Sequence, residues 1–140
     1  MNRRLETLLL RAAHTRPHAP AVRVGRSVYS YQDIHDRANQ LGCVLQRIGA
    51  ARGDRIGIWM EKSAASVAAM QAVLRVGACY VPLDPLASLA RTQQVIRDAD
   101  LRAIVTTIDR KQRGLDVDLR YIPLIAMRTR GSEPSASAFS

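Results

Sequence analysis

Two acidic residues, Glu61 and Asp84, stand where an α/β protein commonly binds its ligands. Each follows a short apolar run that predicts a β-strand, and the helical pattern between the runs predicts that the two strands are parallel and adjacent. The carboxyl ends of such strands share one edge of a sheet, so both carboxylates could reach a ligand there. A turn or helix-capping role is the more common use of an acidic residue at these positions, and we favour it.

Other reactive side chains are scattered. Cys43 falls in a predicted helix and Cys79 in a predicted strand, neither is near a second Cys or a paired His, and both are expected to be buried, reduced thiols. His14, His18 and His35 also form no metal-ligand spacing. We therefore expect no catalytic residue and no metal-binding residue in this chain.

A phosphate-binding loop is also missing from the pattern. Such a loop needs clustered glycines at a strand-to-helix turn, often with a Lys, and the eight glycines here are dispersed. Neither of the two common glycine-rich phosphate motifs occurs. No cofactor-binding residue is predicted.

Charge and hydropathy exclude several classes of protein. The net charge is +9, with 19 Arg and the two lysines Lys62 and Lys111, but no block of five basic residues occurs, which favours a solvated surface over a specific nucleic-acid partner. Apolar runs fall far short of the roughly 18 residues that cross a membrane. Glu6, Arg11 and His14 interrupt any signal-peptide core, so a cytoplasmic location is expected.

The first third of the chain predicts a helix, a hairpin and a longer helix. Apolar spacing indicates a helix over 4–14, and two alternating runs flank Gly25 and Arg26 as in a β-hairpin. Ser30 and Asp33 resemble a capping box, and Gly49 ends the amphipathic helix that follows. We assign the polar face of that helix to solvent or a partner; it carries Gln32, His35, Asp36, Asn39 and Gln40.

The middle of the chain reads strand, helix, strand, helix, strand. A turn at Asp54 precedes a strand over 55–60, Ser63 caps a helix that Gly77 ends, and Pro82 is expected to stop the strand over 78–81. A helix then starts at Ser88 or Pro85 and runs to about 98, and a strand covers 101–107. Helices of this length between strands predict a parallel sheet and the α/β class. The expected core is Ile34, Leu41, Leu45, Ile56, Ile58, Val67, Met70, Leu74, Val81, Ile104 and Val105.

Regular structure is expected to fade after this layer. The polar segment 109–119 predicts a loop, the apolar residues of 121–125 predict one further short strand limited by Pro123, and the composition of 128–140 predicts a disordered tail. The chain is long enough for one domain, which we place at 1–127.

Several segments, in order, resemble a known family. Tyr-Ser-Tyr-Gln-Asp-Ile at 29–34 is similar to the first core motif of the AMP-forming, adenylate-forming ligases. Leu-Arg-Val-Gly-Ala-Cys-Tyr-Val-Pro-Leu-Asp at 74–84 is similar to their second core motif, with Arg91 where an Arg is common beyond it. Departures are mild: Arg75 and Val76 replace Lys and Ala, and Ile34 replaces Leu.

The resemblance implies part of the N-terminal subdomain of a ligase fold, a parallel βαβαβ layer preceded by a helix, a small hairpin and a long amphipathic helix. Family members include acyl-CoA synthetases and the adenylation domains of nonribosomal peptide synthetases. They join a carboxylate to ATP, with Mg²⁺, before transfer to a thiol. The family's phosphate loop, ribose-binding acid and catalytic Lys all come later than the matched segments, so none is carried over to a residue here.

The resemblance leaves three functions open. The first is a truncated ligase that is inactive alone and binds no ATP or Mg²⁺ by itself. The second is one half of a split ligase, completed by a separate chain. The third is a basic binding module that reuses the fold. The isolated chain is expected to expose apolar surface that a whole ligase would cover and to self-associate through it.

Overall fold

The computed structural model describes residues 4–112, 119 and 122–128. They form five helices and six strands in the order α1 (Leu5–Thr15), β1 (Pro20–Val24), β2 (Ser27–Ser30), α2 (Tyr31–Arg47), β3 (Arg55–Trp59), α3 (Ala64–Arg75), β4 (Cys79–Leu83), α4 (Leu89–Ala99), β5 (Ala103–Thr107), α5 (Ile108–Gln112) and β6 (Leu124–Met127).

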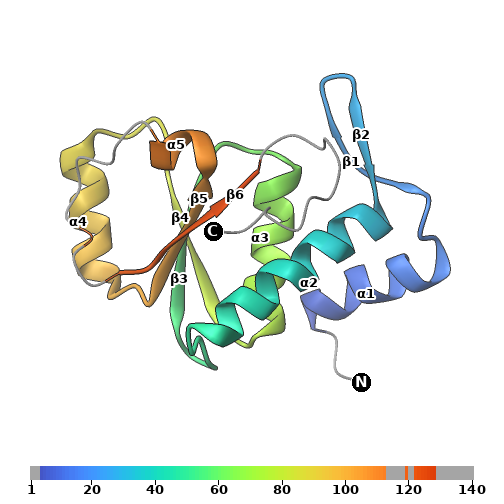
Figure 1. Cartoon of the computed structure of the whole chain (residues 1–140), viewed down its shortest axis with the longest axis horizontal. Helices are drawn as coiled ribbons and strands as arrows, with labels where there is room; N and C mark the ends of the chain where they lie inside the picture. The colour runs from blue at the N-terminus through green and yellow to red at the C-terminus, as the bar shows by residue number, and fades with distance from the viewer. Residues whose placement is uncertain (1–3, 113–118, 120–121, 129–140) are drawn as a thin grey trace.

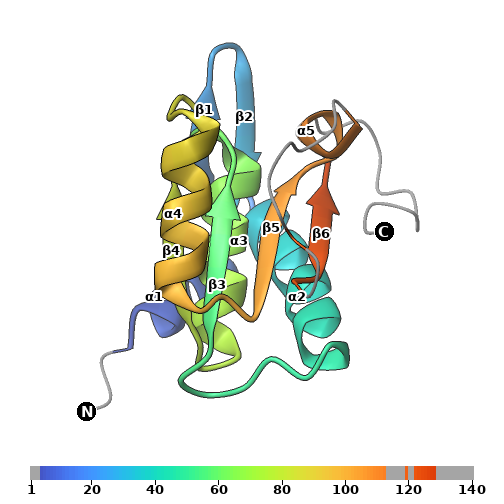
Figure 2. The ribbon, with the colours of Figure 1, turned by 90° about the vertical axis from the view of Figure 1, so that its left-hand side faces the viewer.

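The centre of the molecule is a parallel sheet with the strand order β4-β3-β5-β6. Helices α2 and α3 cover one face and α4 covers the other, while β1 and β2 form a separate antiparallel hairpin (Figure 1 and Figure 2). The predicted α/β class and the parallel βαβαβ order are confirmed. Because all four strands run the same way, their carboxyl ends meet at one edge of the sheet.

Local side chains fix where the central helices begin. The Ser30 hydroxyl accepts from the Asp33 amide at 3.1 Å, and the Asp33 carboxylate accepts from the Ser30 amide at 2.8 Å. Ser63 and Ser66 make the same reciprocal pair at the start of α3. Both capping boxes satisfy amides that have no partner inside the helix.

Two glycines fix where these helices end. Gly49 and Gly77 have φ of +82° and +81°, a left-handed conformation that a side chain disfavours. At each end the glycine amide and the next amide turn back to carbonyls of the last helical turn, for example from Ala50 to Leu45 at 2.9 Å and from Ala78 to Val73 at 3.1 Å. Each of these helices therefore ends a few residues before the next strand begins, α2 before β3 and α3 before β4.

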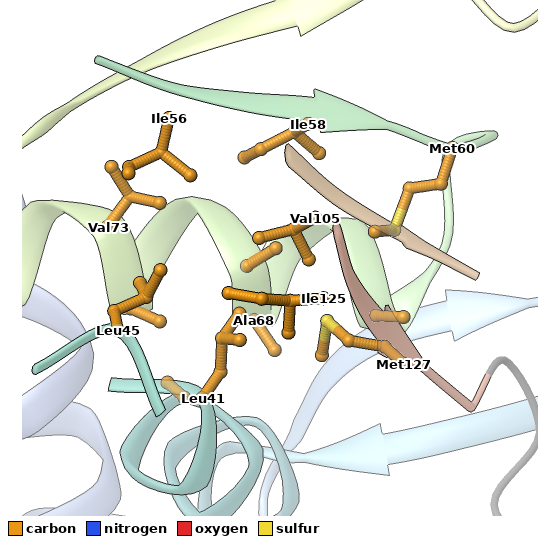
Figure 3. Close-up of a cluster of buried hydrophobic side chains, with 14 of the residues drawn as sticks. Leu41, Leu45, Ile56, Ile58, Met60, Ala68, Val73, Val105, Ile125 and Met127 are labelled. Carbon is orange, nitrogen blue, oxygen red and sulfur yellow. The ribbon is translucent and has the colours of Figure 1, made fainter. Parts of the chain in front are cut away.

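Buried side chains lie on both faces of the sheet. The larger cluster lies between the sheet and helices α1, α2 and α3. Figure 3 shows Ile56, Ile58 and Val105 of the sheet facing Leu41 and Leu45 of α2 across this cluster. The smaller cluster lies on the α4 side and contains Trp59, Leu83, Ile96, Leu101 and Ile104.

The expectation that Ile104 and Val81 join the same core as Ile58 is wrong. Ile104 belongs to the α4 side and Val81 packs there half-buried, because successive residues of a strand point to opposite faces. The expected buried face of α3 is also corrected: Val67, Met70 and Leu74 are half-buried. The fully covered face consists of Ala64, Ala65, Ala68, Ala69, Ala72 and Val73.

Pro82 does not stop its strand. It pairs in register with Ile58 inside β4, which is an edge strand of the described sheet. The Cys79 amide donates to Asp54 O at 2.8 Å on the β3 side. The alternation of a strand then turns Pro82 away from β3, where its missing N–H removes no bond of the sheet.

Two further expectations concern the later segments. The loop expected over 109–119 is wrong at its start, because Ile108–Gln112 forms the short helix α5. The further strand expected near 121–125 is present as β6, which runs parallel to β5. It begins after Pro123, at Leu124. The tail expected over 128–140 lies, except for Arg128, outside the described residues.

A polar contact joins α2 to α3. Arg75 donates from Nη1 to Asn39 Oδ1 at 2.5 Å and from Nη2 to His35 Nδ1 at 2.9 Å. The face of α2 assigned to solvent or a partner is thus partly an internal contact. Burial, and next the Arg75 charge, lower the pKa of His35, against an opposing effect of Asp36.

The first testable prediction concerns the tight packing at the middle of β3. A Cβ on Gly57 would lie 2.9 Å from Leu101 Cδ1 and 3.2 Å from Ile104 Cγ1, whereas a Cβ on the buried Gly42 meets nothing within 4 Å. Gly57→Val should lower the free energy of unfolding by about 1–3 kcal/mol through overpacking. Gly42→Ala should raise it by about 0.5–1 kcal/mol through helix propensity. Urea denaturation measures both, and an equal response of the two variants would contradict the packing.

A second prediction concerns pH. Since the folded-state pKa of His35 is lowered, the unfolded chain takes up a proton more readily, and stability should fall as the pH drops through about 6.5. Between pH 7.5 and 5.5, the midpoint temperature of thermal unfolding should fall less for His35→Gln than for the parent chain. His18→Gln, at an exposed site, is the control and should keep the parent slope.

Candidate functional site

A groove of about 950 Å³ opens at the carboxyl ends of β3 and β4. Strand β1 of the hairpin, helix α3, and strand β4 with the loop after it line this groove. Most of its lining is apolar and comes from Val22, Val24, Ile58, Met60, Val67, Met70, Tyr80, Pro82, Leu83, Pro85 and Leu86. A cavity of this size and character, at the carboxyl edge of a parallel sheet, is the default place to look for a binding site.

Glu61 and Asp84 both line the groove, as their predicted positions on adjacent strands require. Asp84 has the expected turn role, because its Oδ1 accepts from the Leu86 amide at 2.9 Å. Glu61 is exposed and makes no hydrogen bond or ion pair with another described residue. The predicted positions of both residues are confirmed, and both lie in one site. The turn or capping role favoured for Glu61 is wrong, because its side chain bonds to no other described residue.

The remaining polar lining is largely engaged in holding the fold. Ser66 Oγ accepts from the Ser63 amide at 2.9 Å and donates to Ser63 O at 2.8 Å, so both serines serve the start of α3. The side chains of Arg23 and Lys62 complete the polar part of the lining. Contacts inside the groove would consequently be mainly apolar.

These residues do not fit ATP. A triphosphate needs several converging backbone amides or cations, whereas the walls of this groove are mainly apolar, and its cations Arg23 and Lys62 share the lining with the carboxylates of Glu61 and Asp84. Among the residues that the structure describes, no group of three or more His, Cys, Asp or Glu side chains could hold a metal ion. No step of nucleotide chemistry can be assigned to this part of the fold.

The expected burial of the two thiols is wrong. Cys43 lies on the outer side of α2, and Cys79 is the first residue of an edge strand, so both are exposed. Both are free thiols. His14 and His18 are also exposed, while His35 is part of the α2–α3 contact described above.

Sequence reasoning missed the hairpin as a wall of the groove. Val22 and Val24 of β1 face helix α3 and strand β4 across the groove, although more than fifty positions separate β1 from β4 in the chain. Their alternation indicates a strand but cannot say which element that strand faces. Trp59 was missed as well: it is buried on the α4 side, its indole Nε1 has no partner among the described residues, and Arg110 lies 5.1 Å from its ring.

The sequence of the chain decides its family. The model of the family described as AMP-binding enzyme matches residues 9–134. The chain belongs to this family. It has the N-terminal portion of an adenylate-forming ligase, as the resemblance of its two core motifs implied.

Individual relatives agree with the family. Tyrocidine synthase 3 of Brevibacillus parabrevis is 32% identical over 105 residues, which are 75% of this chain and 2% of that protein. An L-proline--[L-prolyl-carrier protein] ligase of Pseudomonas fluorescens is 34% identical over 67% of this chain and 19% of its own length. The crystal structure of VinN superposes with a TM-score of 0.76 at 26% identity, over 86% of this chain and 30% of VinN.

These coverages set the scale of the match. The chain spans less than a fifth of the two curated relatives and less than a third of VinN. The helices that the structure describes include none long and apolar enough to cross a membrane.

A third prediction tests the turn at the groove. Asp84→Ala removes the acceptor for the Leu86 amide and should lower the free energy of unfolding by about 1 kcal/mol. Asp84→Asn keeps an acceptor oxygen and should lose less than half as much. Glu61→Gln is the matched control and should leave stability unchanged, as chemical denaturation of the three variants would show.

Proposed function

We propose that this chain provides the N-terminal scaffold of an AMP-forming ligase that activates a carboxylate with ATP, and that residues 1–140 do not perform this reaction alone. The observation that carries the proposal is the family match over 9–134, on a parallel sheet whose carboxyl-edge groove does not suit ATP. In this view ATP and Mg²⁺ bind elsewhere in a complete ligase domain.

The substrate class that the relatives favour is an amino acid. Several of them are nonribosomal peptide synthetases, and one is an L-proline ligase acting with a carrier protein. We infer that the ligase to which this scaffold belongs activates an amino acid for transfer to a carrier thiol. An acyl-CoA synthetase type stays the alternative within the same family.

A split ligase is a second candidate, in which a separate chain completes residues 1–140. The open apolar groove favours it, because a complementing chain would cover this surface. Self-association through the same surface, a basic binding module that reuses the fold and the cytoplasmic location all stay predictions.

The fourth prediction tests the proposed function. The purified chain should give no amino-acid-dependent exchange of pyrophosphate into ATP, because electrostatic stabilisation of the transferred phosphorus is usually the largest catalytic contribution and no phosphate loop is present. Exchange by the chain alone, above a heat-treated control, would contradict the proposal.

A chimera supplies the positive arm of this experiment. This chain replaces the matched segment of the Pseudomonas fluorescens L-proline ligase, and proline-dependent exchange should return. The same chimera with Gly57→Val should be less active in proportion to its loss of stability, whereas Gly42→Ala should leave exchange intact. Restoration by two separately purified polypeptides would favour the split ligase.

A further inference from the structure

The polar contact between α2 and α3 leaves two buried atoms without partners. Arg75 donates from Nη2 to His35 Nδ1 at 2.9 Å and from Nη1 to Asn39 Oδ1 at 2.5 Å. Within the part of the chain that the structure describes, Arg75 Nε and Gln71 Oε1 are buried and have no hydrogen-bond partner. Buried polar atoms are nearly always paired in folded proteins, so this pair of exceptions calls for an explanation.

The chemistry of the guanidinium group determines which nitrogen of His35 carries a proton. A guanidinium has donors and no acceptor, so His35 Nδ1 must accept from Arg75 and cannot hold a proton. The proton of the neutral ring is therefore on Nε2, which lies 3.1 Å from Asn39 Nδ2. As long as Arg75 stays in this place, His35 is held in a single tautomer.

Asn39 cannot satisfy both of its neighbours at once. Its Oδ1 accepts from Arg75, while its Nδ2 meets the Nε2–H of His35, which places two donors against each other. Turning the amide over would give His35 an acceptor, but the amide nitrogen would then meet the donors of Arg75. The contact therefore has one acceptor too few while Arg75 is bound to His35.

Gln71 offers the guanidinium of Arg75 a second place. Gln71 precedes Arg75 by four residues on α3, so the two side chains lie on the same face of the helix, one turn apart. Its Oε1 is an acceptor without a partner, and Arg75 Nε is a donor without one. A bond between these two atoms would satisfy both and would release Asn39 Oδ1 to accept from His35.

The charges around the ring act in opposite directions. Burial and the charge of Arg75 on α3 lower the pKa of His35, whereas Asp36 on α2 raises it. Arg16, at the end of α1, and Arg37 of α2 lie over tyrosine rings. Arg75 is thus the cation that faces the ring across the contact, and its position decides whether the ring can be charged.

We propose that these residues form a proton-operated switch between α2 and α3, in which Arg75 binds His35 and Asn39 while the ring is neutral and moves to Gln71 when His35 is protonated. A proton from solvent takes the lone pair of Nδ1, which can then no longer accept from the guanidinium. The Nε2–H of the charged ring donates to Asn39 Oδ1, and Arg75 Nε donates to Gln71 Oε1. The switch needs only side-chain rotation, and it does not depend on the proposed ligase function.

The tautomer of His35 is the first test. Nitrogen NMR of the whole ¹⁵N-labelled chain, between about pH 8 and pH 5, reports which ring nitrogen carries a proton. At the high end of this range His35 should be present only as the Nε2–H form. His14 and His18 are exposed and should average both tautomers in the same sample. An Nδ1–H form of His35, or the same averaging at all three rings, would overturn the proposal.

Two variants should move the titration midpoint of His35 in opposite directions. Arg75→Gln should raise it, because an amide can donate to Nδ1 or accept from its proton. Gln71→Met should lower it, because the charged state loses the second acceptor for the guanidinium. Arg26→Gln removes the same charge at an exposed site of the hairpin turn and should leave the midpoint unchanged. A merely structural contact would not give shifts of opposite sign.

The movement of Arg75 has a readout of its own. Hydrogen exchange at Arg75 Nε–H, taken relative to Arg26 Nε–H in the same sample, should slow at least about fivefold once His35 is protonated, because the group gains an acceptor. Gln71→Met should abolish this slowing. An unchanged ratio in the parent chain would mean that Arg75 does not reach Gln71, and it would overturn the switch.

Two further outcomes would also overturn the proposal. They are midpoint shifts of the same sign in Arg75→Gln and Gln71→Met, and an equal shift in Arg26→Gln and Arg75→Gln, which would make net charge the cause. Circular dichroism checks that each variant is folded. If Arg75→Gln is not, Arg75→Lys keeps the charge but loses the planar fork, and it should still raise the midpoint because one of the two bonds is lost.

Discussion

The small side chains on one face of α3 set how closely this helix approaches the sheet and α2. Ala65, Ala68, Ala69 and Ala72 are fully buried on the side of the sheet that also carries α2. Alanine loses no rotamer freedom on burial and lets a helix approach its neighbours closely. Because α3 lies close to the sheet and to α2, Ile56 and Ile58 of the sheet can pack against Leu45 of α2 in one shared core (Figure 3). The larger residues Val67 and Met70 are then left half-buried at the groove.

Positive charge has a structural role at the amino ends of the parallel strands. Arg55 Nη1 donates to the carbonyl of Ala99 at 2.9 Å, and Arg102 donates to the carbonyl of Ile48. Ala99 ends α4 and Ile48 caps α2, so each guanidinium meets the negative end of a helix. Part of the net charge of +9 thus stabilises helix ends, which gives the arginines a role that requires no acidic partner.

Features set by neighbouring residues were predictable, and features set by distant ones were not. The caps at Ser30 and Ser63 and the turns at Gly49 and Gly77 depend on side chains or backbone angles within a few positions. The exposure of Cys79 depends on β4 being an edge strand, which no local pattern reveals. Glu61 and Asp84 were placed together because parallel strands share an edge, whereas the hairpin wall of the groove required knowledge of how α3 packs on β1.

The same topology explains why the fold can be recognised although no catalytic residue is assigned among the described residues. Crossover helices bring the carboxyl ends of β3, β4, β5 and β6 to one edge, and this edge is where α/β proteins place ligands. At this edge the described residues provide an Asx turn, two engaged serines and a mainly apolar groove, which the charged side chains of Arg23, Glu61 and Lys62 also line. Apolar walls bind by excluding water and supply no charge to a developing phosphate, so they suit a packing partner better than a nucleotide. The physical character of the groove therefore favours packing against other apolar groups over binding of a charged nucleotide.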